Sequence, residues 1–358
     1  MPKRAPRREG GGLWGFITFL ASIAIVAAAA ALVAAFAFIA EANRAGPSSE
    51  QALFTVEQGA TATAIGQALE RDGLIRSELF FRIANRAYAR EQSLQAGEYE
   101  IPAGASLREI VRMMAEGHAL LHAVTIPEGY TTAMAMRVIA EADMLTGDMP
   151  ETPPDGSILP ETYHVQRGMT RAALVQQMRD ARDAAVEEIW AARAPNLPIA
   201  TPEEMVILAS IVEKETGLPE ERPQVAAVFT NRLRIGMALQ SDPTIIYGVC
   251  RRYPARCENG RLVNDRTRQP RTIRESEIAL DTGYNTYRIQ RLPPTPIANP
   301  GRAALEAVTH PPESGALYFV ANGTGGHAFA ATVAEHNANV ARWREIERVR
   351  LAQEAATP

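Results

Sequence analysis

Hydrophobic positions along the chain begin with one long uninterrupted run. Residues 13–40 contain no charged side chain, and only Thr18 and Ser22 add hydroxyl groups to this apolar sequence. About 20 apolar residues, each rising ~1.5 Å, are enough for a helix to cross a bilayer. We therefore predict a transmembrane helix over residues 13–40. Residues 1–12 carry four basic side chains and a single acid, so the positive-inside rule places this basic tail in the cytoplasm and the rest of the chain across the membrane.

A cleaved signal peptide is the alternative interpretation of this run. The sequence Ala40-Glu41-Ala42 has the small-x-small pattern of a signal peptidase site. The apolar core of a signal peptide is only about 7 to 15 residues long, and the run here is longer. We therefore favour a permanent anchor, followed by a linker over residues 41–52.

Beyond the linker, one local pattern occurs three times. The end of a short apolar run is followed by a glycine turn, a hydroxyl residue that can cap a helix, and an amphipathic segment. The three copies begin Val56-x-x-Gly59-x-Thr61, Ile101-x-x-Gly104-x-Ser106 and Ile126-x-x-Gly129-x-Thr131. Each copy predicts a strand, a turn and a helix, and the unequal spacing of the glycines argues against a solenoid. The predicted fold class is α+β.

Two longer helices are predicted in the second half of the chain. Residues 171–194 are polar with a few apolar positions and predict one long helix. The next helix begins at Thr201, because Thr201 and Glu204 form a capping box and Pro202 occupies the first helical position. Gly217 is a stop signal for this helix.

The second of these helices carries the first candidate for catalysis. On a 3.6-residue repeat, Glu215 shares an apolar stripe with Leu208 and Ile211, whereas Glu213 points away from that stripe. Burial and the negative end of the helix dipole both raise the pKa of a carboxyl at this position. A carboxyl that stays protonated near neutral pH is suited to general acid catalysis. The alternative is that Glu215 is a structural acid paired with a buried arginine such as Arg232.

Polar and aromatic side chains are concentrated in short motifs and proline-stiffened loops of the C-terminal half. Aromatic faces can stack on pyranose rings, while amides and carboxylates bind sugar hydroxyl and acetamido groups, so these motifs suit a sugar polymer. The candidate substrate-binding residues are Asn231, Gln240, Asp242, Tyr284, Asn285, Tyr287 and His327.

Charge and composition narrow the function classes. The 37 basic and 41 acidic residues give a net charge of −4, which lacks the basic excess expected of a nucleic-acid-binding protein. Hydrophobic residues make up 46% of the chain, which indicates a folded protein rather than a disordered one. We expect no nucleic-acid partner and no cofactor.

His327 and His336, with Glu335 as a third ligand, are the candidates for a zinc site. The spacing of the two histidines fits neither a helix-face pair nor a zinc finger, and no cysteine lies nearby. We therefore predict no metal site.

Several motifs taken together resemble the YceG-like endolytic murein transglycosylases. The resemblance covers most of the chain after the anchor, in the same order as in that family. The segments that carry it are Leu208-Ala209-Ser210-Ile211-Val212-Glu213-Lys214-Glu215-Thr216, Asn231-Arg232-Leu233, Leu239-Gln240-Ser241-Asp242-Pro243-Thr244, Tyr284-Asn285-Thr286-Tyr287, the Leu292–Gly301 loop and Gly325-Gly326-His327-Ala328-Phe329.

The resemblance implies a membrane-anchored lytic transglycosylase, a lyase that needs no water. Such an enzyme cleaves nascent peptidoglycan between N-acetylmuramic acid and N-acetylglucosamine, leaves 1,6-anhydromuramyl ends and limits strand length. The family's catalytic glutamate is the second one of Glu-Lys-Glu-Thr, which is Glu215 here. A single carboxyl suffices for this reaction because the muramyl C6 hydroxyl is an internal nucleophile.

The resemblance also implies a domain organisation and a location. A LysM-like module is expected over residues 53–120, a YceG-like catalytic domain over residues 121–345 and a C-terminal tail over residues 346–358. The protein would be a single-pass protein of the bacterial inner membrane with its catalytic domain in the periplasm. Its partners would be peptidoglycan strands, the lipid bilayer through residues 13–40 and, as candidates, peptidoglycan synthases.

Two other functions stay open at this point. One is a hydrolytic muramidase that uses Glu215 and Asp242 as its two acids. The other is a non-catalytic peptidoglycan-binding anchor. The chain also departs from the family at Asp155-Gly156, where the family usually has Glu-Gly, so a groove contact there is not carried over.

The segment over residues 249–271 is particular to this chain. It contains Cys250 and Cys257. Because the compartment outside the inner membrane is oxidising, we favour a disulfide between them over two free thiols.

Overall fold

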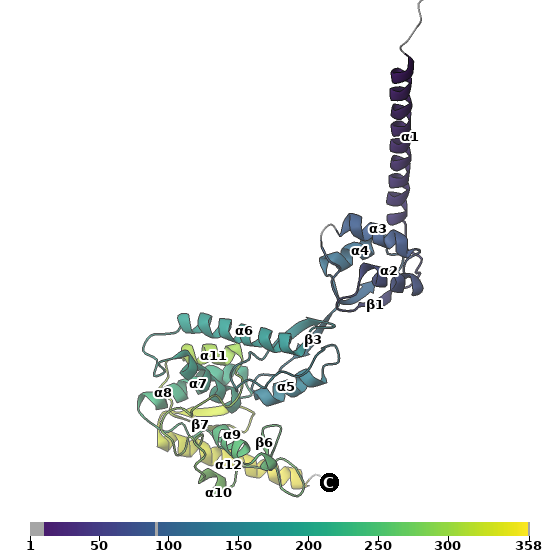
Figure 1. Cartoon of the computed structure of the whole chain (residues 1–358). Helices are drawn as coiled ribbons and strands as arrows, with labels where there is room; N and C mark the ends of the chain where they lie inside the picture. The colour runs from purple at the N-terminus through teal and green to yellow at the C-terminus, as the bar shows by residue number, and fades with distance from the viewer. Residues whose placement is uncertain (1–10, 90–91, 357–358) are drawn as a thin grey trace, which may run out of the picture. The chain divides into compact units, whose positions relative to one another are not determined.

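The computed structural model describes residues 11–89 and 92–356, and the chain divides into two compact units (Figure 1). Residues up to 121 and residues 166–168 form the first unit, and the remainder forms the second. Most of the predicted basic tail, residues 1–10, lies outside the described residues.

The first unit begins with α1, Gly11–Ala42. Its residues Trp14–Ala42 are long and apolar enough to cross a membrane, and none of the side chains in their most apolar window is buried in the protein. The helix therefore includes the predicted range 13–40 and continues two residues beyond it. Its C-terminal end is covered, with Phe38 partly buried and Ala42 fully buried.

The rest of the first unit packs three helices on a two-stranded sheet. Strand β1, Ala52–Val56, is antiparallel to β2, Gly97–Ile101. The helices are α2, Ala62–Arg71, α3, Glu78–Tyr88, and α4, Leu107–Glu116. Thr61 caps α2, and Ser106 forms a capping box with Glu109 at the start of α4. The first two predicted strand–turn–helix patterns are thus confirmed.

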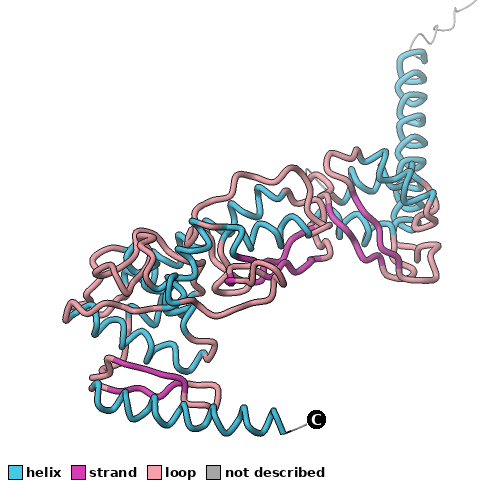
Figure 2. Tube along the Cα trace, turned by 90° about the horizontal axis from the view of Figure 1, so that it is seen from below, coloured by secondary structure: helices cyan, strands magenta, loops and turns pink. Residues whose placement is uncertain are grey.

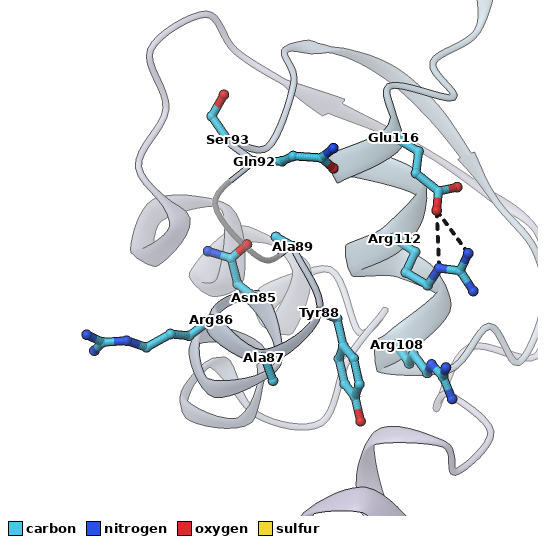
Figure 3. A pocket seen from close by; sticks show the side chains of 10 residues that line it. All are labelled: Asn85, Arg86, Ala87, Tyr88, Ala89, Gln92, Ser93, Arg108, Arg112 and Glu116. Atoms are coloured by element: carbon cyan, nitrogen blue, oxygen red, sulfur yellow. Dashed lines mark hydrogen bonds and ion pairs between the residues drawn. The ribbon is translucent and has the colours of Figure 1, made fainter.

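A broad pocket of the first unit lies between α3 and α4 (Figure 3). Tyr88 projects between the two helices, and the Arg108 guanidinium lies 5.3 Å from the centre of its ring. Arg112 donates two hydrogen bonds to Glu116 one turn further along α4.

The second unit opens with the third predicted pattern. Strand β3, Leu121–Thr125, pairs with β4, Thr162–Gln166, and Thr131 caps α5, Thr132–Glu141. Helix α6, Arg171–Ala191, ends three residues before the predicted end at 194 because Ala192 already closes the last turn.

Helices make up the centre of the second unit. Helix α7, Pro202–Glu215, is capped by the Thr201 hydroxyl, as predicted, but the Glu204 carboxylate accepts from the Ala200 N–H rather than from the Thr201 N–H, so only half of the predicted capping box forms. It is surrounded by α6, by α8, Arg222–Arg234, by α9, Asp242–Arg252, and by α11, Arg302–Thr309. All nine side chains from Met205 to Glu213 are buried. The helix is therefore enclosed on every side, whereas the sequence predicts a single apolar stripe.

Short elements and a hairpin complete the second unit. The one-turn segments are η1, Pro219–Glu221, η2, Pro254–Arg256, and α10, Glu275–Ile278. The two-residue strands β5, Cys257–Glu258, and β6, Arg261–Leu262, are antiparallel. Strands β7, Tyr318–Ala321, and β8, His327–Ala330, form an antiparallel hairpin that lies along α12, Val333–Ala356 (Figure 2).

Candidate active site

Glu215 is the last residue of α7, and its side chain is half-buried. The pKa of Glu215 is raised to about 7, chiefly by burial and in smaller part by the charge of Asp242, whereas the Ser241 hydroxyl and the Arg232 guanidinium act in the opposite direction. No carboxylate-to-guanidinium contact within 4 Å is found for Glu215 among the described residues. A carboxyl with this pKa exchanges its proton near neutral pH, as a general acid must.

Glu213, two residues earlier, has a different environment. Its side chain is 4% exposed and accepts hydrogen bonds from Arg222 and from the backbone N–H of Gly301, each at 3.0 Å. Burial raises the pKa of Glu213, while Gly301 and Arg222 oppose that effect. The expectation that Glu213 points away from the buried side of the helix is therefore wrong. Because α7 is enclosed all round, both carboxyls are inside, and Glu213 is the paired structural acid.

Arg232 does not pair with Glu215. Its Nε donates to the Leu317 carbonyl at 2.7 Å, and its Nη1 donates to the Leu239 carbonyl at 2.5 Å. Burial lowers the pKa of Arg232, with Tyr318, Glu215 and Tyr287 opposing the shift. The alternative in which Glu215 is the ion-pair partner of Arg232 is thus not realised, and Arg232 is a positive charge fixed near the carboxyl by two carbonyls.

Asp242 and Tyr287 form a hydrogen-bonded pair near Glu215. The Tyr287 hydroxyl donates to Asp242 Oδ1 at 2.8 Å. Burial raises the pKa of Tyr287, and Asp242 and Glu215 raise it further. Asp242 is also the first residue of α9, where a negative side chain interacts favourably with the helix dipole. The structure brings these two predicted residues into the electrostatic neighbourhood of Glu215.

Ser241 belongs to the same cluster and was not among the predicted site residues. It is fully buried, and its backbone N–H is bonded to Thr286 Oγ1 at 2.9 Å. Its hydroxyl lies close enough to lower the pKa of Glu215, yet Ser241 Oγ has no well-aligned hydrogen-bond partner in the described part of the chain. The sequence signal for this residue is its position directly before Asp242 and Pro243, which marks a helix start.

Three other predicted residues hold loops in place. Asn231 Nδ2 donates to the carbonyls of Ser314 and Ala316, at 2.6 and 3.1 Å. Asn285 is fully buried and donates to the carbonyls of Ile278 and Leu280. The Tyr284 hydroxyl bonds to Thr295 Oγ1 at 2.8 Å. A role in substrate binding stays a prediction for these residues, and Asn285 could exert it only through the loop that it supports.

Gln240 and His327 differ in their exposure and in their hydrogen-bond partners. The Gln240 side chain is exposed, and its backbone adopts a left-handed φ of 51° while its N–H donates to the Thr286 carbonyl. His327 lies in β8, where both its backbone N–H and its Nδ1 bond to the Glu221 carboxylate, at 2.7 and 2.6 Å. No group of three metal-binding side chains occurs in the described residues.

Two cavities lie beside the end of α7. The first has a volume of about 500 Å³ and is lined by Lys214 and Pro243, the chain neighbours of Glu215 and Asp242. The second, of about 550 Å³, also contains Lys214 in its wall. Glu215 itself does not line either cavity. Cys250 and Cys257 line the first cavity and are joined by a disulfide bond.

Comparisons with known proteins agree with the motifs. The YceG-like family matches residues 54–342. An endolytic murein transglycosylase of Bacillus subtilis is 27% identical over 314 residues, which are 79% of this chain and 82% of that protein. Endolytic murein transglycosylases of two Streptococcus pneumoniae strains are 27% identical over 337 residues, and the match spans 57% of their length and 80% of this chain.

Among solved structures, a yceG-like protein of Listeria monocytogenes is 24% identical and matches 81% of this chain and 99% of that one, with a TM-score of 0.49. The family match extends from the first strand of the first unit into the last helix of the second. This chain therefore belongs to the YceG-like family.

Proposed function

We propose that this protein is an endolytic peptidoglycan transglycosylase in which Glu215 is the general acid. The observation that carries the proposal is the raised pKa of Glu215, about 7, in a carboxyl that has no ion-pair partner in the described part of the chain. The relatives named endolytic murein transglycosylases supply the substrate class. At the same end of α7, Glu213 forms a buried ion pair with Arg222. Glu215 is therefore the carboxyl that remains free to exchange a proton.

In the proposed reaction, protonated Glu215 donates its proton to the glycosidic oxygen between the two sugars. The bond to C1 of the muramyl residue breaks, and the Glu215 carboxylate then takes the proton of the muramyl C6 hydroxyl as that oxygen attacks C1. The proton is thereby returned and the product carries a 1,6-anhydro ring. The negative charge on the Asp242–Tyr287 pair would favour the positive charge that develops on the sugar.

Mass spectrometry of digested glycan strands tests this proposal. We expect anhydromuramyl ends from the native protein and no cleavage by Glu215→Gln. Reducing ends would instead select the hydrolytic muramidase, for which Asp242 is the available second acid because it lies near Glu215. Unchanged cleavage by Glu215→Gln would exclude Glu215 as the acid. A native protein that binds strands without cleaving them would select the non-catalytic anchor.

The proposed organisation places α1 across the bacterial inner membrane, with residues 1–12 in the cytoplasm. A LysM-like module over residues 53–120 and a catalytic domain over residues 121–345 would then face the periplasm, where peptidoglycan synthases are candidate partners. The apolar length of Trp14–Ala42 supports the anchor. Protease added to intact spheroplasts should digest both proposed domains, and protection of the chain would contradict this orientation.

A further inference from the structure

The two cavities beside α7 have walls that carry many charges. They share seven lining residues, of which Lys214 and Arg261 are basic and Glu258 is acidic. Lys214 directly precedes Glu215 and Pro243 directly follows Asp242, so the cavities are lined by chain neighbours of both site residues, although Glu215 and Asp242 themselves do not line them. The Cys250–Cys257 disulfide closes the segment that carries Arg251 and leads to Arg261. The disulfide therefore constrains the conformation of this part of the cavity wall.

The acidic side chains of these walls are already engaged. Glu128 pairs with Arg222 at 3.1 Å, and Glu258 pairs with Arg268 at 3.5 Å. Asp155 accepts hydrogen bonds from the backbone N–H of Thr132 at 2.6 Å and from the Tyr247 hydroxyl at 2.7 Å. Arg251 Nη1 donates to the same Tyr247 hydroxyl at 3.5 Å. Asp155 is therefore near Arg251 and offsets part of its positive charge.

The remaining basic side chains lack carboxylate partners. Within the described residues, no carboxylate lies within 4 Å of the basic groups of Arg137, Lys214 or Arg261. Arg137 donates to Asn259 Oδ1 at 2.8 Å, and Lys214 Nζ donates to the Gly129 carbonyl at 3.2 Å. Burial lowers the pKa of Lys214, and the nearby charge of Arg261 lowers it further. Like charges held together in this way favour binding of an anion between them.

We propose that these cavities bind the carboxylates of the peptides attached to the glycan strand. This inference rests on the proposed function, because the muramyl residue at the cleaved bond carries its peptide on the lactyl group and thus beside Glu215. The peptide carries free carboxylates, and the guanidinium groups of Arg137 and Arg261 can each bind one through two parallel hydrogen bonds. The protein would accordingly select strands that keep their peptides over strands that have been stripped of them.

Binding rather than cleavage tests this proposal. The Glu215→Gln protein is titrated with a fluorescent glycan fragment that retains its peptides and with the same fragment after amidase removal of the peptides. We expect Arg261→Ala, added to this background, to weaken binding of the peptide-bearing fragment about tenfold, which corresponds to ~1.4 kcal/mol. Binding of the stripped fragment should not change. Arg266→Ala is the matched control, because Arg266 is an exposed arginine of the same segment that does not line either cavity.

Equal binding of the two fragments by the parent protein would overturn the proposal, as would an Arg261→Ala variant that binds both as the parent does. Equal weakening of both fragments would also overturn it, since it would indicate a structural role for Arg261. The proposed function fails by a different result, the absence of strand cleavage by the native protein.

Helix α3 has two apolar faces. Phe81 and Ala84 are fully buried in the core, whereas Leu79, Phe80 and Ile83 are 54%, 37% and 44% exposed. An outward apolar face of this kind on a short helix is typical of helices that lie in a membrane interface.

The outward face of α3 is continuous with the end of the membrane-crossing helix. The ring of Phe38 in α1 stacks on the rings of Phe80 and Tyr88, with centroid distances of 6.4 and 6.2 Å. Phe38 lies four residues before the end of α1, or about 6 Å along the helix. Arg86 follows on the exposed side of α3 and extends away from Tyr88 (Figure 3). A basic residue beside exposed apolar side chains is typical of a helix that lies in a membrane interface.

We infer that α3 lies in the lipid interface, with Leu79, Phe80 and Ile83 inserted beside α1. The inference rests on the proposed membrane anchor. Both native cysteines are in the disulfide, so one new cysteine can be labelled selectively in the full chain in lipid nanodiscs. An environment-sensitive dye at Ile83→Cys should emit at shorter wavelength and be quenched by lipid-borne quenchers, whereas the dye at Leu53→Cys should report water.

Leu53 is a matched control because it is a 63% exposed leucine of the same unit outside α3. A dye at Ile83→Cys that is as aqueous as the dye at Leu53→Cys would overturn the inference. A dye at Ala30→Cys, in the middle of α1, tests the anchor separately. If that dye also reports water, the membrane anchor itself is contradicted.

Discussion

Two carboxyls at the end of one helix differ in what surrounds them. Glu213 is enclosed with Arg222 and the Gly301 N–H, so its charge is matched by partners that the fold supplies. Glu215, two residues later, faces Ser241, Asp242 and Arg232 without an ion pair, and its pKa is raised to about 7. The difference shows that burial alone does not identify a catalytic acid. What distinguishes the proposed acid is burial without a neutralising partner.

The largest expected effect follows from removing the unpaired acid. Glu215→Gln keeps the shape of the side chain but cannot donate a proton, so strand cleavage should fall by about 10³-fold or more. The thermal midpoint of the purified protein at pH 7 should not drop, because no ion pair is lost. Cleavage within tenfold of the native rate would mean that the two carboxyls have been assigned the wrong way round.

Removing the paired acid should give the opposite result. Glu213→Gln removes one of the two carboxylates that pair with Arg222, while Glu128 remains at 3.1 Å, and loss of one charge-assisted hydrogen bond of this kind should lower the free energy of unfolding by ~2 kcal/mol. Urea unfolding at pH 7 measures this loss. The fraction that stays folded should cleave strands at close to the native rate. A fully stable Glu213→Gln protein that is inactive would show that Glu213, rather than Glu215, takes part in the chemistry.

The comparison also predicts a pH dependence of stability. The pKa of Glu215 is about 7 in the folded chain and about 4.3 in an unfolded one. Between these values the folded state holds more protons, so stability decreases as the pH rises, and the charged Glu215 destabilises the fold above pH 7. Glu215→Gln should therefore be more stable than the native protein at pH 8, by up to ~3 kcal/mol, and equally stable near pH 4.

Glu213→Gln is the control for this experiment, since it should be less stable than the native protein at pH 8. A native protein whose stability does not change between pH 5 and pH 8 would contradict the raised pKa. Cleavage should follow the same titration and decline above pH 7, as Glu215 loses its proton.

The sequence identified this site only in part. Thr201, Pro202 and Glu204 define the start of α7, and the helical repeat places Glu215 on an apolar stripe, so both follow from local rules. The environment of Glu213 could not be predicted in this way. A helical projection describes one helix alone, whereas the partners of Glu213 come from α8 and from Gly301, 88 residues away in the chain.

The start of α9 at Asp242 does not follow from the local sequence alone. Pro243 is compatible with either a turn or a first helical turn, and packing against α7 decides between them. The contacts of Asn231 are also non-local, because it bonds to carbonyls more than 80 residues away. Residue type alone does not separate an amide that binds sugar from one that fastens a loop.

The smallest expected effect concerns the surroundings of the unpaired acid. Tyr287→Phe removes the hydrogen bond to Asp242 and leaves the ring in place. The loss of one such hydrogen bond changes the interaction free energy by ~1 kcal/mol. With one donor fewer, the Asp242 charge acts more strongly on Glu215, so the pKa of Glu215 should rise and the decline of cleavage above pH 7 should move to higher pH. Cleavage at pH 6 should drop only a fewfold.

Tyr253→Phe is the control, because Tyr253 lies beyond α9 and stacks with Arg256 rather than acting on Glu215. A pH profile that Tyr287→Phe leaves in place would show that Asp242 does not control the proton on Glu215, and the contrast with Glu213 would then rest on burial and the absence of an ion pair alone.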